Sequence, residues 1–96
     1  MKLKLINAAN AEDAPSAGAE NRVPGGPLTG IFYASGDFGA SGEVRIEVKN
    51  AAGVYTAYPE LTWTSNASRE LKFQPGAEPK LVAENCTSVT AELHLW

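Results

Sequence analysis

The sequence predicts an all-β protein: a small antiparallel β-sandwich or barrel of six to eight strands with an extended N-terminal arm. Three observations lead to this fold class. Apolar and polar residues alternate with a period of two, turn residues separate these stretches at short intervals, and no three-turn helical pattern interrupts them. With 96 residues, 44% of them hydrophobic, the chain has material for one domain at most.

The N-terminal part of the chain differs in composition from the rest. Between Asn7 and Gly30, the sizeable apolar residues are Val23 and Leu28, and Ala, Gly, Pro and Asn predominate. Such a segment buries too little apolar surface to offset an ordering entropy of about 1–2 kcal/mol per residue. We therefore expect an extended arm over residues 1–27, with at most a turn of helix near residues 8–14, and a β domain over residues 28–96.

The beginning of this arm has two interpretations. Polar and apolar side chains alternate over residues 2–6, as they do in a half-buried strand. Such a strand either adds to the sheet of another chain or forms the first strand of this chain's own domain. The sequence leaves both alternatives open.

The clearest strand of the β domain is Glu43–Lys49, because Val44, Ile46 and Val48 share one face. Asn50–Gly53 provides a turn, and Val54–Tyr58 is expected to return as the second strand of a hairpin. Upstream, we expect an apolar strand at Gly30–Ala34, and the glycine-rich stretch Gly36–Gly42 is expected to be a flexible connection.

Four further strands are expected downstream, and turn residues follow each of the first three. They are Leu61–Thr64, Glu70–Gln74, Lys80–Glu84 and Ser88–Trp96, the last being the longest alternating stretch. The expected core consists of the inward-facing positions, which are Phe32, Ala34, Val44, Ile46, Val48, Tyr55, Leu61, Trp63, Leu71, Phe73, Leu81, Ala83, Val89, Ala91, Leu93 and Leu95.

Residues that could carry chemistry are few. The single cysteine, Cys86, and the single histidine, His94, provide neither an internal disulfide nor four zinc ligands. No glycine-rich elbow or third orienting group accompanies them, and the 11 acidic residues are scattered as on solvated strand faces. We therefore expect no enzyme, no catalytic or metal residue and no cofactor. Cys86 is interpreted as a small turn or core residue, and His94 as a polar residue on one strand face.

Charge and hydropathy exclude further classes of partner. A net charge of −3 argues against nucleic acid, and the longest large-apolar run, Ile31–Tyr33, is too short to cross a membrane. Asn7, Asn10 and Glu12 interrupt the N-terminal apolar stretch, so we expect no signal peptide and synthesis in a cytoplasm. A domain this small has little material for a cleft, so no small-molecule ligand is expected.

Association with another chain is expected instead, since a core this thin has no disulfide or metal to support it. The candidate partner-binding residues are Leu3, Leu5, Val23, Leu28 and Trp96. A C-terminal tryptophan suits a contact anchor. The alternative for Trp96 is that it covers the open end of the sandwich, against Tyr33 or Tyr58.

Several stretches together resemble a known group of proteins. The run Gly30–Val48 has a glycine-rich loop before an alternating strand. This run, a late strand after the turn Gln74–Gly76 and the apolar last strand Val89–Leu95 resemble small β-proteins encoded among tailed-bacteriophage virion genes. The resemblance implies a virion accessory protein made in the host bacterial cytoplasm, such as a capsid decoration protein with an arm across coat subunits. Its partners would be the major capsid protein or other virion proteins, with a homo-oligomer as a further option. No binding residue carries over from the resemblance.

Other functions remain open alternatives. A position at the tail or neck of the virion belongs to the same class. A carbohydrate- or ligand-binding β-sandwich module would use Trp63, Tyr55, Tyr58 and Tyr33 as an aromatic platform, although Tyr55 and Tyr58 share a face only if a bulge separates them. An enzyme inhibitor would present the exposed loop Gly36–Gly42.

Overall fold

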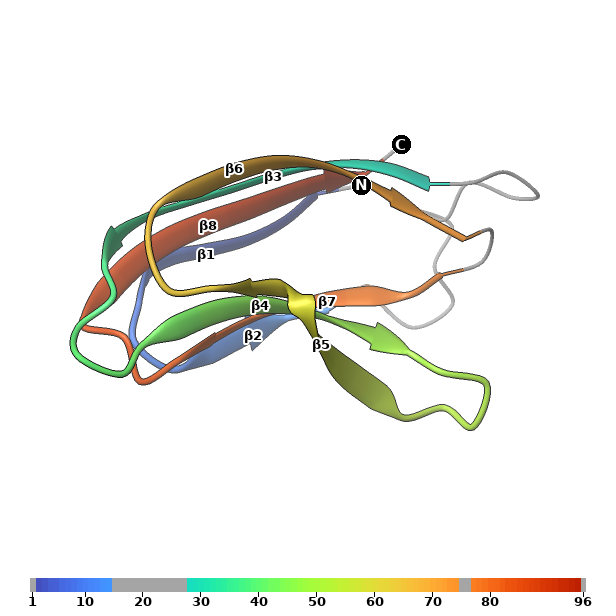
Figure 1. Ribbon diagram of the computed structural model, residues 1–96, viewed down its shortest axis with the longest axis horizontal. Helices are drawn as coiled ribbons and strands as arrows, with labels where there is room; N and C mark the ends of the chain where they lie inside the picture. The colour runs from blue at the N-terminus through green and yellow to red at the C-terminus, as the bar shows by residue number, and fades with distance from the viewer. Residues whose placement is uncertain (1, 15–27, 75–76, 96) are drawn as a thin grey trace.

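The chain folds as a sandwich of two four-stranded antiparallel sheets in a computed structural model that describes residues 2–14, 28–74 and 77–95 (Figure 1). Sheet A contains, in spatial order, β1 (Lys2–Ala8), β8 (Ser88–Leu95), β3 (Leu28–Asp37) and β6 (Ala67–Phe73). Sheet B contains β2 (Ala11–Asp13), β7 (Pro79–Glu84), β4 (Glu43–Lys49) and β5 (Tyr55–Trp63). The predicted all-β antiparallel sandwich is confirmed.

The strand pairing follows one rule. β1 pairs with β8, β2 with β7, β3 with β6 and β4 with β5, so the first half of the chain pairs with the second half in reverse order. This is a long hairpin rolled into two sheets, and the pairs β3–β8 and β4–β7 complete the sheets. Such an arrangement is the jelly roll, a double-sheet fold of eight strands.

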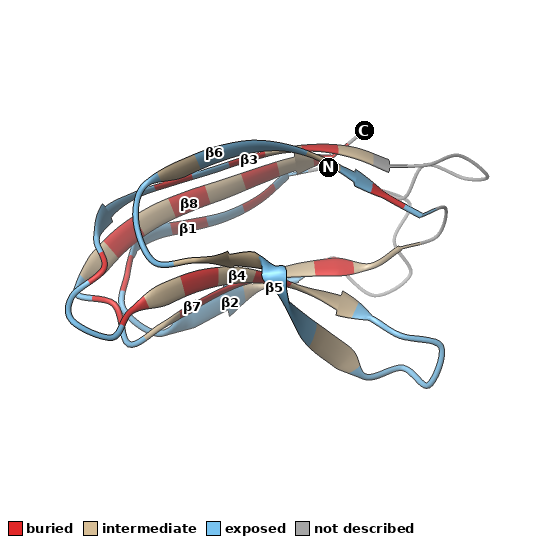
Figure 2. Cartoon of the chain, viewed as in Figure 1, coloured by how far each residue is buried: buried red, intermediate tan, exposed pale blue. Residues whose placement is uncertain are grey.

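The core lies between the sheets and follows the predicted alternation. In β8 every second residue is buried (Figure 2). Phe32, Ile46 and Leu81 have no exposed surface. Trp63 stacks on Phe32 with 4.1 Å between the ring centroids. The structure adds Leu3, Leu5, Ala8, Phe38 and Cys86 to the predicted core, while Val48, Leu61, Trp63 and Leu71 are partly buried against it.

Strand β5 departs from the prediction because it is irregular. It runs through Pro59 as one strand where two were expected, and its register with β4 shifts between Arg45 and Glu47. The shift changes which residues face inward, so Tyr55 is not a core residue. Its ring instead contacts the ammonium groups of Lys80 and Lys49, at 4.5 and 5.4 Å from the ring centroid.

The described N-terminal residues belong to the sandwich, which corrects the expected arm over that stretch. Leu3 lies opposite Leu93 and Leu5 opposite Ala91, so the alternation at residues 2–6 matches the inward face of β8. The turn of helix expected near residues 8–14 is wrong, since residues 11–13 form β2. The rest of the expected arm, residues 15–27, lies outside the described residues.

The four edge strands each carry a feature that hinders pairing with another chain. β1 has outward lysines and a register shift after Leu5, with Asn7 at a φ of 48°. β2 is only three residues long, and β5 contains Pro59. β6 carries Arg69 opposite the buried Phe32, so a charge stands on the inward side of the strand.

Replacing Leu3 by alanine tests whether β1 is part of the core. Leu3 is 2% exposed, so Leu3→Ala should lower the free energy of unfolding by about 2–4 kcal/mol, measured by urea denaturation. Ile6, on the same strand, is 60% exposed, and Ile6→Ala should cost less than about 1 kcal/mol. Equal effects of the two variants would contradict the placement of β1.

Candidate functional site

The strand connections at one end of the sandwich form a continuous surface, which we call the loop end. It consists of residues 9–10, 37–42, 64–66 and 85–87. These are Asp37, the last residue of β3, and the connections from β1 to β2, β3 to β4, β5 to β6 and β7 to β8 (Figure 1). Loops held together at one end of a rigid sandwich are a common place for binding residues. The loop end is therefore the candidate functional site.

Hydrogen bonds tie the loop after β7 to the loop after β1. The Asn85 amide donates to Asn10 Oδ1 at 2.9 Å, and the Cys86 amide donates to the Ala9 carbonyl at 3.1 Å. Asn85 adopts a φ of 57°, in the left-handed region that asparagine tolerates. These contacts join residues that are 75 positions or more apart, so the local turns depend on the whole fold.

A second set of hydrogen bonds holds the glycine-rich loop. The Thr87 amide donates to the Asp37 carbonyl at 3.1 Å, and the Gly36 amide donates to Asn66 Oδ1 at the same distance. Asp37 Oδ1 accepts from the Gly39 amide at 2.9 Å. Phe38 lies in the middle of the loop and is only 6% exposed. The expected flexible connection is therefore an anchored turn, because a buried aromatic ring fixes it.

Steric contacts explain why two positions in this segment are glycine. A Cβ atom at Gly42 would overlap the carbonyl oxygen of Phe38 and lie 2.9 Å from the carbonyl oxygen of Asn85. Gly36 has a φ of 128°, and a Cβ atom there would lie 2.5 Å from the Ser88 carbonyl oxygen. The close approach of backbones thus accounts for part of the glycine content of the segment.

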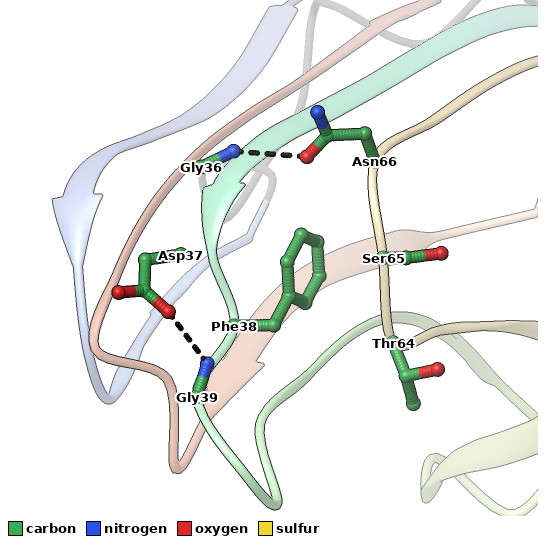
Figure 3. A pocket seen from close by; sticks show the side chains of 7 residues that line it. All are labelled: Gly36, Asp37, Phe38, Gly39, Thr64, Ser65 and Asn66. Carbon is green, nitrogen blue, oxygen red and sulfur yellow. Dashed lines mark hydrogen bonds between the residues drawn. The ribbon is translucent and has the colours of Figure 1, made fainter.

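An open cavity of about 570 Å³ lies in the loop end (Figure 3). It is lined by Gly36, Asp37, Phe38, Gly39, Thr64, Ser65 and Asn66. The Phe38 ring projects toward the 64–66 segment, whereas the Asp37 carboxylate points to the other side of the loop. The Thr64 and Ser65 hydroxyls point away from the ring. The polar groups therefore do not converge on one point, as acid–base chemistry or tight binding of a small ligand requires.

The loop end carries little charge. Among residues 9–10, 37–42, 64–66 and 85–87, Asp37 is the one charged residue, and the others are Asn, Ser, Thr, Ala, Gly, Phe and Cys. Cys86 is buried, with Sγ 3.4 Å from the Glu43 carbonyl oxygen, which confirms it as a turn and core residue. The exposed surface of the loop end is thus small, polar and nearly uncharged.

The outer face of sheet B shows the opposite character. The Arg45 guanidinium donates to Glu47 at 2.7 Å, to Glu84 at 3.2 Å and to Glu43 at 3.3 Å. Burial alone would lower the pKa of Arg45, but the hydrogen bonds and charges of Glu47 and Glu84 outweigh it and raise the pKa. These charges are satisfied by one another and stabilise the face.

The residues predicted to bind a partner lie in different parts of the structure or outside its described residues. Leu3 and Leu5 are buried in the chain's own core, which corrects their proposed role in partner binding, because their side chains are not accessible. Leu28 pairs with Phe73 through the β3–β6 ladder. Val23 and Trp96 lie outside the described residues.

His94 and Cys86 lie far apart. Cys86 precedes β8, and His94 is near the far end of that strand, roughly 25 Å away at about 3.3 Å per residue. His94 lies on the outer face of sheet A with Nε2 3.2 Å from Glu92 Oε2, which confirms its interpretation as a polar residue on a strand face. The two residues therefore do not form a nucleophile–base pair.

The four residues of the expected aromatic platform do not share a face. Trp63 stacks on Phe32, Tyr33 is exposed on sheet A, and Tyr55 lies under lysines on sheet B. Tyr58 lines a different cavity with Val48, Leu61 and Phe73, although β5 does contain the bulge that the platform needed.

Within residues 2–14, 28–74 and 77–95, no three His, Cys, Asp or Glu side chains gather as metal ligands would. The described part of the chain has no helix that could cross a membrane.

Comparison with protein-family models, curated proteins and solved structures finds no match for this chain.

A glycine substitution tests the anchoring of the loop end. Gly42→Ala should lower the free energy of unfolding by about 2–4 kcal/mol, because backbone must move to make room, and should speed hydrogen exchange at residues 85–87. Gly53 has a φ of 83° and open space around it, so Gly53→Ala should cost only about 1–2 kcal/mol and leave that exchange unchanged. A milder effect at Gly42 than at Gly53 would contradict the anchoring.

Proposed function

We propose that this chain is a non-enzymatic structural protein of a tailed-phage virion that binds the capsid shell through its loop end, as a decoration protein. The sequence resemblance suggests this class. The jelly roll adds support at the level of architecture, since viral capsid domains use it. Lectins and cupins use it as well, so the fold alone does not select a function.

The observation that carries the proposal is a loop end that is both rigid and nearly uncharged. Loops already fixed by hydrogen bonds lose little conformational entropy when they bind, so more of the contact energy appears as affinity. Asp37 is the one charged residue there, and charged residues are depleted from the centres of protein interfaces. Exposed Asn, Ser and Gly provide hydrogen-bonding groups for an uneven protein surface.

Several charged side chains already take part in ion pairs or hydrogen bonds, which supports the non-enzymatic part of the proposal. Arg45, Lys80 and Lys49 form ion pairs with glutamates on the outer face of sheet B. Asp37 accepts a hydrogen bond from its own loop. These groups are engaged in holding the surface together.

Cosedimentation with shells tests the function. Recombinant chain is added to purified shells of the phage that encodes it, prepared without the protein. The wild type should bind at a saturating number of sites. Ser65→Arg should weaken binding at least ten-fold, because Ser65 is exposed in the loop end and a long cation there blocks close contact. Ala52→Arg, in the hairpin at the opposite end, makes the same kind of change and should bind as the wild type does.

Two outcomes would oppose the proposal. Failure of the wild type to bind the shells would reject the decoration role, and full binding by Ser65→Arg would reject the loop end as the contact. Glycan-array binding that Ser65→Arg abolishes would favour the carbohydrate-binding module instead.

A further inference from the structure

The outer face of sheet A carries a second surface, which we call the outer A face. Strand register arranges its side chains in rows across the sheet. One row contains Lys2, His94, Ile31 and Glu70, from β1, β8, β3 and β6 in turn. In the next row Glu92 on β8 stands beside Tyr33 on β3.

Apolar groups are exposed in the middle of this charged surface. Tyr33 is 47% exposed, and no hydrogen bond joins its hydroxyl to another described residue. Ile31, beside it on the same face, is partly exposed. Tyr33 is one of the four large apolar side chains most exposed in the described structure. An aromatic ring with a free hydroxyl, surrounded by charges, is typical of a protein contact.

The rows are complementary to themselves under a twofold rotation. Consider an axis that lies against the face, parallel to the strands, and passes between β8 and β3. It places β1 of one copy over β6 of the other, and β8 over β3. Lys2 then meets Glu70 of the second copy, Glu92 meets the hydroxyl of Tyr33, and each contact occurs twice.

We propose that two copies of this chain associate face to face through the outer A face, about this twofold axis. Charge complementarity identifies the partner as a second copy. Lys2 and Glu70 stand on opposite edge strands, three strand spacings or about 14 Å apart, so they do not pair within one copy. A twofold dimer brings both pairs together at once.

Two further observations favour this mode of association. The edge strands are protected against strand addition, so faces and loops are the surfaces left for contact. The pKa of Glu92 is lowered by its hydrogen bond with His94 and then by Lys2, whose Nζ lies 3.4 Å away. The ionised carboxylate would accept a hydrogen bond from the Tyr33 hydroxyl of the second copy.

The small size of the face favours a weak dimer. Strand spacing and rise make the four-stranded face roughly 19 by 23 Å, at the small end for specific interfaces. Packed sheets keep their strands within about 30°, so the Glu92–Tyr33 contact near the axis is retained and the long Lys2 side chain accommodates the twist. We expect a Kd of roughly tens to hundreds of micromolar.

Sedimentation equilibrium of the full chain, up to about 1 mM, tests the proposal. The wild type should dimerise. Lys2→Glu and Glu70→Lys should each raise the Kd at least ten-fold, because each puts like charges together in both contacts. An equimolar mixture of the two variants should recover the wild-type Kd, since both contacts of the mixed dimer join opposite charges. Glu60→Lys, an identical charge change on β5 of sheet B, should leave the Kd unchanged.

Tyr33→Phe provides an independent variant with little risk to folding, because Tyr33 is half exposed. Loss of its hydroxyl should raise the Kd about three- to ten-fold. A monomeric wild type, unchanged association of the charge variants, or a mixture that stays as weak as its components would overturn the proposal. Shells are absent from this experiment, so its failure leaves shell binding through the loop end untouched.

Discussion

Strand β8 is the constraint on which the rest of the fold depends. It pairs with β1 on one side and β3 on the other, and its inward residues Val89, Ala91, Leu93 and Leu95 are all buried. Leu3 and Leu5 are held in this core by the pairing of β1 with β8. The same pairing aligns Lys2, His94 and Ile31 into a row, and it sets the position from which the 85–87 loop reaches residues 9–10. The core, the outer face of sheet A and the loop end therefore all depend on the position of β8.

The alternation of side chains predicts most of the fold, because it is a local property. β4 and β8 follow directly from their period of two, and their inward residues are buried as expected. The period also predicts a strand at residues 2–6, but not which chain it joins, since any complementary apolar face satisfies the same pattern. Tyr55 shows where the argument fails. The register shift in β5 reverses the facing of residues beyond it, and periodicity carries no signal for that shift.

The sequence does not predict which loops come together at the loop end, and the reason is physical. The sequence indicates Gly36–Gly42 as an exposed loop, and its glycines mark a segment of tight backbone contact. Its neighbours are residues 64–66 and 85–87, and their proximity depends on strand order, which local patterns do not contain. Because glycines flank Phe38, the sequence predicts it as part of a flexible connection. A bulky apolar residue between glycines is the available signal that such a loop turns inward.

The pairing of β1 with β8 also bears on how the protein is made. The partner of the first described strand is the last one, so contacts of the largest sequence separation close sheet A. Folds dominated by such distant pairings fold slowly. During synthesis, Leu3 and Leu5 have no place to be buried until the residues of β8 have emerged from the ribosome. Throughout that interval the apolar face of this segment is exposed, and folding intermediates with exposed apolar surface tend to aggregate. Lys2 and Lys4 flank these leucines, and their positive charges oppose aggregation until β8 has been synthesised.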